Sequence, residues 1–233
     1  MRIYFLMLAS NLVTLLWQSI PIPVIHNLQK ATMLKKLFWQ QNIDAVHGDY
    51  LEFGVAHGNS MKSALLASQK SGSKMLGIVK IERNFHGFDT FEEFNSSFEM
   101  DQHETWTGDR FSLEIHKVSR RFKKYDNVFL HKLDVQNIGE LELKTLLGSD
   151  GKVAIALFDM DLYGPTITAL DWIEPRIQKG TYLVFDEFFA FRGDSKLGES
   201  RALEEFLARY RHIHLRPVMQ YGAGGQVFVV SDC

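Results

Sequence analysis

Residues 152–188 read KVAIALFDMDLYGPTITALDWIEPRIQKGTYLVFDEF, and this stretch decides the fold. It opens with the apolar run KVAIALF, which is typical of a central parallel strand covered on both faces. A helical pattern follows over 164–180, with Pro165 near its first turn and Gly180 just past its end. Pro175 predicts a kink or a split in that helix, and TYLVF predicts a second buried strand.

Strand-like and helical patterns alternate on both sides of this stretch. Such alternation predicts an α/β fold with a mostly parallel sheet and helices on both faces. In sheets of this kind, ligands bind at the carboxyl ends of the strands. The predicted strands are 49–58, 74–81, 85–89, 127–135, 152–159, 181–188 and 224–230. The predicted helices are 59–70, 111–125, 138–148, 164–180 and 200–213, and we expect a loop or lid over 91–110.

Composition narrows the class of protein. The chain has 233 residues, is 45% hydrophobic and contains 18 Phe, which provides for a sizeable core and argues against disorder. The formal net charge of −2 argues against a strongly basic nucleic-acid surface, and we expect no nucleic-acid partner. The one cysteine, Cys233, excludes a disulfide framework and a four-cysteine zinc site.

The first 47 residues form a separate segment in this interpretation, a helical extension ahead of a catalytic domain over 48–233. Residues 1–20 are apolar but are interrupted by Ser10, Asn11 and Thr14, so no run reaches the ~18 residues that span a bilayer. Two alternatives stay open: a helix buried on a core or in a homodimer, and a membrane anchor or signal. For the protein as a whole we expect a cytoplasmic location.

A glycine loop follows the first predicted strand, in the sequence EFGVAHG. Gly54 and Gly58 allow a tight turn and a close approach of the backbone to a ligand. Glu52 supplies a carboxylate that suits a cationic ligand end or a ribose. An ordinary strand-to-helix turn explains the same residues equally well.

Two later carboxylates stand where a nucleoside would be bound. Asp89 ends the strand over 85–89 and could accept hydrogen bonds from a ribose diol, with Glu82 as a rival for that role and helix capping as the alternative. Asp134 follows the next strand and could accept from an adenine amino group, or could serve a turn.

Four carboxylates mark the ends of two neighbouring strands: Asp159, Asp161, Asp186 and Glu187. Like charges held this close raise each other's pKa unless a positive group lies between them. A hard divalent cation such as Mg²⁺ is the natural partner, because it prefers oxygen ligands. Helix capping by Asp159 and Asp186 is the structural alternative. The chain has no HExxH, no nucleophile elbow and no Walker loop.

The chain resembles the class I S-adenosylmethionine-dependent methyltransferases, and more narrowly the macrocin-O-methyltransferase family of small-molecule, often sugar, O-methyltransferases. The resemblance rests on YLEFGVAHGNS, GFDTFEEF, the stretch FDMDLYGPTITALDWIEPRIQKGTYLVFDEF and GESRALEEF, over about residues 48–230. It implies a Rossmann-like, seven-stranded sheet with the last strand antiparallel, and extra N-terminal helices that cover the site or form a dimer.

The resemblance also implies roles for the residues. The loop from Glu52 to Gly58 would cradle the methionine part of S-adenosylmethionine, with Asp89 on the ribose and Asp134 by the adenine. Asp159 would bind both the cofactor and a metal ion. The other residues that the resemblance implies are Asp186 and Glu187 as further Mg²⁺ ligands and Asp161 as the general base. Glu187 departs from the family pattern, in which Asp is usual.

These observations predict methyl transfer to a hydroxyl of a small molecule, assisted by a divalent metal. Two alternatives from other classes stay open. One is a metal-dependent hydrolase or phosphotransferase that uses the same carboxylates, and the other is a non-catalytic binding protein of the same fold.

Overall fold

The computed structural model describes residues 10–11, 13–92, 114–137, 145–148 and 151–233. Within them, seven strands form one sheet in the order β3-β2-β1-β4-β5-β7-β6. The strands are β1 (Asp49–Phe53), β2 (Phe85–Asp89), β3 (Val128–Lys132), β4 (Val153–Phe158), β5 (Tyr182–Phe185), β6 (His214–Tyr221) and β7 (Gly225–Asp232).

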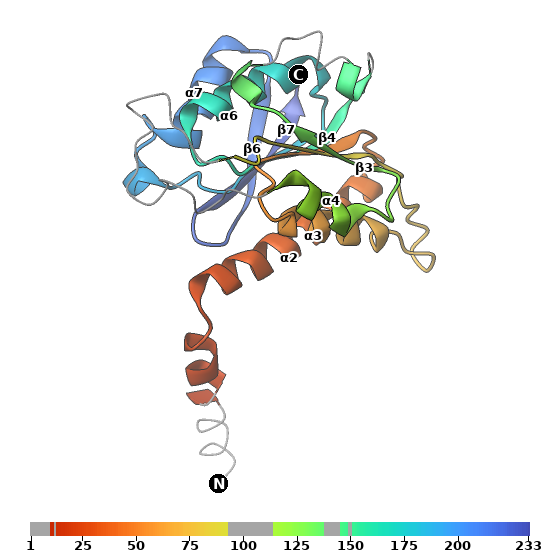
Figure 1. Ribbon diagram of the computed structural model, residues 1–233, viewed down its shortest axis with the longest axis vertical. Coiled ribbons are helices and arrows are strands. Elements are labelled where there is room, and N and C mark those ends of the chain that lie inside the picture. Colours follow the sequence, from red (N-terminus) through yellow and green to blue (C-terminus); the bar gives the residue numbers. More distant parts are fainter. Residues whose placement is uncertain (1–9, 12, 93–113, 138–144, 149–150) are drawn as a thin grey trace.

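Strands β1 to β5 are parallel to one another, and β7 runs antiparallel to both β5 and β6. This confirms the predicted mostly parallel, Rossmann-like sheet with an antiparallel last strand. Helices cover both faces, with α2, α3 and α4 on one side and α6 and α7 on the other (Figure 1). The helices are α2 (Ile22–Ile43), α3 (Asn59–Gln69), α4 (Ile115–Phe122), α6 (Tyr163–Ile173) and α7 (Gly198–Arg209).

Strand β4 is central, and all six of its residues are buried, as its uninterrupted apolar sequence predicts. Helix α6 ends at Ile173, and a 3₁₀ turn over Glu174–Arg176 follows it. Pro175 lacks the backbone N–H that an α-helix needs at this point, so the predicted split occurs here.

A row of stacked phenylalanines crosses the sheet just below the carboxyl ends of its central strands. Phe53 stacks on Phe88 and on Phe158 with ring centroids 5.0 and 5.4 Å apart, and Phe158 stacks on Phe185 at 4.9 Å. All four side chains are fully buried. Close-packed aromatic rings resist displacement, so this row forms a rigid floor for the strand ends above it.

Two strand assignments from the sequence were wrong. The apolar segment 74–81 forms no strand; it makes only an isolated antiparallel bridge between Ser73 and Ile78, and its Met75 and Val79 are exposed. The edge strand β6 was missed because Pro217 and alternating polar residues weaken its pattern. Proline is tolerated on an edge strand, where one row of N–H groups has no partner.

The N-terminal extension divides into two parts. Helix α2 packs Met33, Leu34, Leu37 and Phe38 into the core formed with α3 and the sheet. Residues 10–11 and 13–18 are also helical, but every described residue from 10 to 19 is exposed. These first turns therefore do not pack on the core of the same chain.

No helix among the described residues is long and apolar enough to cross a bilayer. The expected lid over 91–110 lies outside the described residues except at its first two positions, and so does most of the predicted helix over 138–148. The boundary at residue 47 between the extension and the domain stays a prediction.

Candidate active site

The functional residues predicted from the sequence gather at the carboxyl edge of the sheet. Strands β1, β2, β4 and β5 end there side by side, as the parallel register requires. The acidic residues placed at this edge are Glu52, Asp89, Asp159, Asp161, Asp186 and Glu187. The fold therefore brings together carboxylates that are up to 135 positions apart, from Glu52 to Glu187.

Gly54 is required where the glycine loop crosses the end of β4. Its φ is +86°, and a Cβ atom there would lie 1.9 Å from the carbonyl oxygen of Asp159. Gly58 also has a positive φ, +73°, and stands at the N-terminus of α3. The loop thus leaves free N–H groups of α3 facing the strand ends, which is the arrangement that binds ligands at a helix N-terminus.

We expect Gly54→Ala to lower the free energy of unfolding by about 3 kcal/mol or more, because a backbone oxygen and a positive φ both oppose the new methyl group. Gly77→Ala is the matched control, since Gly77 has a φ of +66° but no atom within 4 Å of the place that the new methyl group would take. Urea denaturation of both variants measures the difference. Equal losses in the two variants would contradict the steric argument.

Asp89 supports the glycine loop. Its Oδ2 accepts hydrogen bonds from the backbone N–H groups of Val55 and Ala56 at 2.7 and 2.8 Å, and its Oδ1 accepts from Phe91 N–H at 2.7 Å. Oδ1 accepts one hydrogen bond and keeps a further lone pair, so a ribose hydroxyl can still be bound there. The rival Glu82 precedes β2 and is mostly exposed in an ion pair with Lys80, so it lies at the opposite edge.

Glu52 is fully buried beneath the loop. Its oxygens accept hydrogen bonds from Tyr50 Oη and Ser60 Oγ, both at 2.6 Å. Burial raises the pKa of Glu52 to about 7, although the two hydrogen bonds act in the opposite direction. Its negative charge is therefore costly until a cationic group approaches.

Asp159, Asp161 and Glu187 form a compact carboxylate cluster. One oxygen of each lies within 4.8 Å of an oxygen of the other two. Asp161 has a φ of +65°, a conformation that costs a non-glycine residue energy and is found where a side chain must be aimed. Glu187 Oε2 is buried without a hydrogen-bond partner. An oxygen donor set with an unpaired buried oxygen fits a hard divalent cation.

Lys30 of α2 reaches into this edge, which was not predicted from the sequence. Its ammonium group donates to Asp186 Oδ2 at 2.6 Å and to Asp159 Oδ2 at 2.8 Å. Burial opposes the charge of Lys30, but the two carboxylates outweigh it and hold the lysine pKa above its ordinary value. The positive group between Asp159 and Asp186 is thus a lysine.

Two further side chains hold Asp186. His26 Nε2 lies 3.0 Å from Asp186 Oδ2, and Tyr221 Oη donates to Asp186 Oδ1 at 2.6 Å. Burial works against ionisation of Asp186, yet the bonds from His26 and Lys30 prevail and hold its pKa at about 2. Asp186 therefore anchors α2 to the sheet, and in this arrangement both of its oxygens already have partners.

Four other carboxyl groups at this edge have pKa values above their ordinary range. Burial and the charge of Asp186 raise the pKa of Asp159 to about 6, and burial with the charge of Asp159 raises that of Asp161 to about 7. Burial and neighbouring carboxylates also raise the pKa values of Glu187 and Glu199 well above their ordinary range. Carboxyl groups held this close together, with raised pKa values, favour the binding of a cation that stabilises their ionised forms.

Glu199, in the first turn of α7, was not predicted from the sequence either. Its Oε2 accepts from the Glu187 backbone N–H at 3.0 Å, and its Oε1 is buried without a partner.

Lys30 did carry a signal in the sequence, because it takes a place in the buried stripe of α2 that continues with Met33, Leu34 and Leu37. A lysine at an apolar position of a helix needs a buried partner.

Asp134 lies after β3 and serves the turn there. Its Oδ1 accepts from Gln136 N–H at 2.9 Å, and its Oδ2 accepts from Asn137 Nδ2 at 2.8 Å. Its role beside an adenine stays a prediction.

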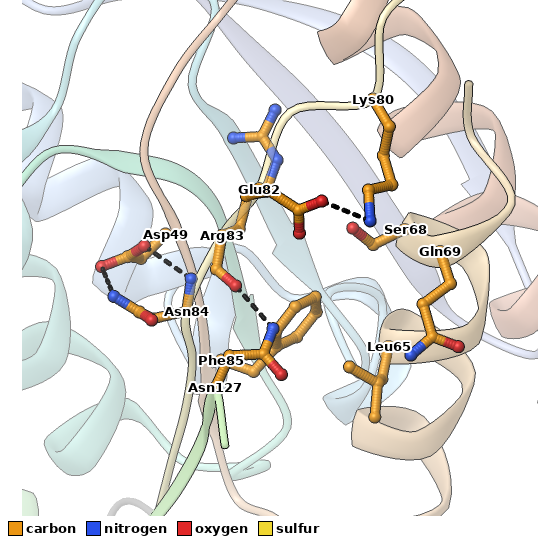
Figure 2. Close-up of a pocket in the computed structure, with 10 residues that line it drawn as sticks. All are labelled: Asp49, Leu65, Ser68, Gln69, Lys80, Glu82, Arg83, Asn84, Phe85 and Asn127. Carbon is orange, nitrogen blue, oxygen red and sulfur yellow. Dashed lines mark hydrogen bonds and ion pairs between the residues drawn. The ribbon is translucent and has the colours of Figure 1, made fainter. Parts of the chain in front are cut away.

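A cavity of about 340 Å³ opens at the other end of the strands. Figure 2 shows it beside Asp49 and Phe85, the first residues of β1 and β2, with the Lys80–Glu82 ion pair on its wall. Because these groups lie at the amino ends of the strands, the cavity is separate from the carboxylate site.

One comparison with known proteins identifies a family. The model of the macrocin-O-methyltransferase (TylF) family matches residues 26–214. A search of curated proteins finds no match. Among solved structures, the calicheamicin methyltransferase CalS11 has a TM-score of 0.65 and 24% identity, covering 85% of this chain and 77% of its own. The O-methyltransferase NovP has a TM-score of 0.65 and 16% identity, covering 87% and 80%. These likenesses show a shared fold.

Proposed function

The chain belongs to the macrocin-O-methyltransferase family, and from that premise we propose that it transfers the methyl group of S-adenosylmethionine to a hydroxyl group of a small molecule. A sugar is the acceptor class that we favour. In support, another structure of CalS11, with a TM-score of 0.58 and 23% identity over 85% of this chain and 78% of its own, is described as a TDP-rhamnose 3'-O-methyltransferase.

The observation that carries this proposal is the gathering of carboxylates, one buried and three half-buried, beside a glycine loop. S-adenosylmethionine has a sulfonium cation and an ammonium group, and both are stabilised by nearby negative charge. Glu52 lies under the loop and the cluster of Asp159, Asp161 and Glu187 lies at its open end. A pyrophosphate placed in the glycine loop itself would be repelled by Glu52. In further support, the fold of a methyltransferase solved with S-adenosylhomocysteine, from Podospora anserina, matches with a TM-score of 0.50 at 16% identity, covering 96% of this chain and 95% of its own.

We further propose that a divalent ion assists the reaction. Asp159 and Glu187 would hold it, with Asp161 alongside, because their oxygens are within 4.8 Å of one another and Glu187 Oε2 has no other partner. Asp186, a ligand by the family resemblance, is engaged by Lys30 and so contributes less readily. A bound ion would lower the pKa of an acceptor hydroxyl and fix its position.

The chain's own residues have three tasks in this mechanism. The loop between Gly54 and Gly58 binds the cofactor, and the strand ends orient the acceptor hydroxyl in line with the sulfonium methyl group. Asp161 takes the hydroxyl proton, because its carboxylate lies beside the oxygens of Asp159 and Glu187 where the acceptor would be held. The carbon–sulfur bond breaks as the carbon–oxygen bond forms, and S-adenosylhomocysteine is released.

Calorimetric titration with S-adenosylmethionine, with and without magnesium, tests the cofactor. We expect micromolar binding that survives addition of a chelator, because the loop and Glu52 hold the cofactor without the ion. Methyl transfer to nucleotide-activated sugars is expected to stop with the chelator and to return with magnesium.

Three outcomes would contradict parts of this proposal. Methyl transfer that persists in the chelator would remove the metal from the mechanism. Cofactor binding without transfer to any hydroxyl acceptor would favour a binding protein of this fold. Magnesium binding without affinity for S-adenosylmethionine would favour a hydrolase or phosphotransferase on the same carboxylates.

A further inference from the structure

The first described turns of the chain present apolar side chains that this chain leaves uncovered. Residues 10–11 and 13–18 are helical and continue beyond the start of α2, away from the sheet (Figure 1). Val13, Leu15, Leu16 and Trp17 are each more than half exposed. At the start of α2, Ile22, Val24 and Leu28 are exposed as well.

The exposed apolar residues of these first turns cover a wide arc of the helix. With about 100° of rotation per residue, the apolar positions spread over an arc of about 200°. The polar residues on the remaining side are Ser10, Asn11, Thr14 and Gln18. A single partner helix buries a stripe of about 100°, so a second copy of this helix would leave much of the arc in water.

The same region is free of charge. No Asp, Glu, Lys or Arg occurs between Arg2 and Lys30. A helix that lies at the boundary of headgroups and acyl chains has an apolar side with Leu and Trp and a polar side in water. Val13, Leu16 and Trp17 opposite an uncharged polar side match that description.

A second apolar element projects from the same side of the sheet. In the loop over 74–79, Met75 is 89% exposed and Val79 is 76% exposed. Figure 1 shows this loop, in gold, at the far end of α3, on the same face of the sheet as α2 but at the opposite end from the N-terminal turns. Helix α4 lies on that side too, and its basic residues are exposed. These are Lys117, Arg120, Arg121, Lys123 and Lys124, the last two directly after the helix.

We propose that residues 13–28 and the 74–79 loop dock this protein on the surface of a lipid bilayer that contains anionic headgroups. Two separate apolar elements on one side, together with the basic residues of α4, match a broad apolar and negatively charged surface. The inference is independent of the methyl-transfer proposal, since it concerns a different surface. Ile22 and Lys30 are about 12 Å apart along α2, so docking would bring the carboxylate site close to the interface.

Flotation of the full-length protein with vesicles tests this proposal. We expect it to float with phosphatidylcholine vesicles that contain phosphatidylglycerol, and to need several-fold more lipid when phosphatidylglycerol is omitted. The triple variant Leu15→Gln, Leu16→Gln and Trp17→Gln should need at least tenfold more lipid for half-maximal binding. Met75→Gln with Val79→Gln should weaken binding independently.

The matched control changes the polar side of the same helix, Asn11→Gln with Thr14→Gln, and should float like the wild type. All of these side chains are exposed, so thermal melting should be unchanged in every variant. Flotation that survives the triple change would overturn the proposal. A wild type that stays with the soluble fraction and sediments as a dimer, with the triple variant monomeric, would assign the surface to a second copy instead.

Discussion

Replacing Lys30 by methionine is expected to abolish methyl transfer and to lower the free energy of unfolding by about 3 kcal/mol or more. The ammonium group bridges Asp159 and Asp186 at 2.8 and 2.6 Å, and methionine would leave the buried Asp186 and the half-buried Asp159 without it. Methionine preserves most of the side-chain volume, so the loss reports the charge rather than a cavity. Urea denaturation and a methyl-transfer assay measure the two effects.

Lys35→Met is the control for this substitution, because Lys35 lies on the exposed side of the same helix and should tolerate the change. A second readout separates the role of the charge from a purely structural one. Magnesium should raise the melting temperature of Lys30→Met more than it raises that of the wild type. In the variant, Asp159 and Asp186 have lost the ammonium group of Lys30 and are free to bind the ion. If Lys30→Met unfolds at the same urea concentration as the wild type, and magnesium raises both melting temperatures equally, Lys30 does not neutralise Asp159 and Asp186.

Asp161→Asn is expected to lower kcat by about 10²- to 10⁴-fold while leaving the affinity for S-adenosylmethionine within a few-fold of the wild type. Asparagine cannot accept the proton, but it tolerates the positive φ of +65° at this position. The backbone should therefore keep its shape. Stability should be equal or higher, because the substitution removes one of several repelling carboxylates.

Single-turnover methyl transfer and calorimetric cofactor binding measure these effects separately. Asp126→Asn serves as the control and should leave both unchanged, because Asp126 is exposed and precedes β3, at the amino end of the strands. Unchanged kcat in Asp161→Asn would remove this residue from the role of general base. A large loss of cofactor affinity would instead place Asp161 in the cofactor site.

Much of the fold is readable from local patterns. The uninterrupted apolar run before Asp159 identified the central strand, and Pro175 marked the end of α6. The failures at 74–81 and 214–221 have one physical cause. Local sequence reports what a strand would bury, whereas a strand also needs a neighbour to pair with. The apolar segment has no partner beyond one bridge, and the polar segment has β7 beside it.

Of the charged residues in the site, only the carboxylates at the strand ends were predictable from the sequence. Carboxylates after Phe88, Phe158 and Phe185 follow apolar strands directly, and parallel strands must end at one edge. The sequence does not show which of these carboxylates lie together. The structure groups Asp159 with Asp161 and Glu187, and it gives Asp186 to Lys30.

The sequence by itself determined most of the alternation of strands and helices, together with the glycine loop, the acidic strand ends and the family resemblance, because each depends on residues that are neighbours in the chain. Only the tertiary structure decided how the charges are balanced. Lys30 binds Asp186 from 156 positions earlier in the chain, and Tyr221 binds it from 35 positions later. Contacts of this kind depend on the packing of α2 against the sheet and on the pairing of β6 with β7, and no local pattern identifies both partners.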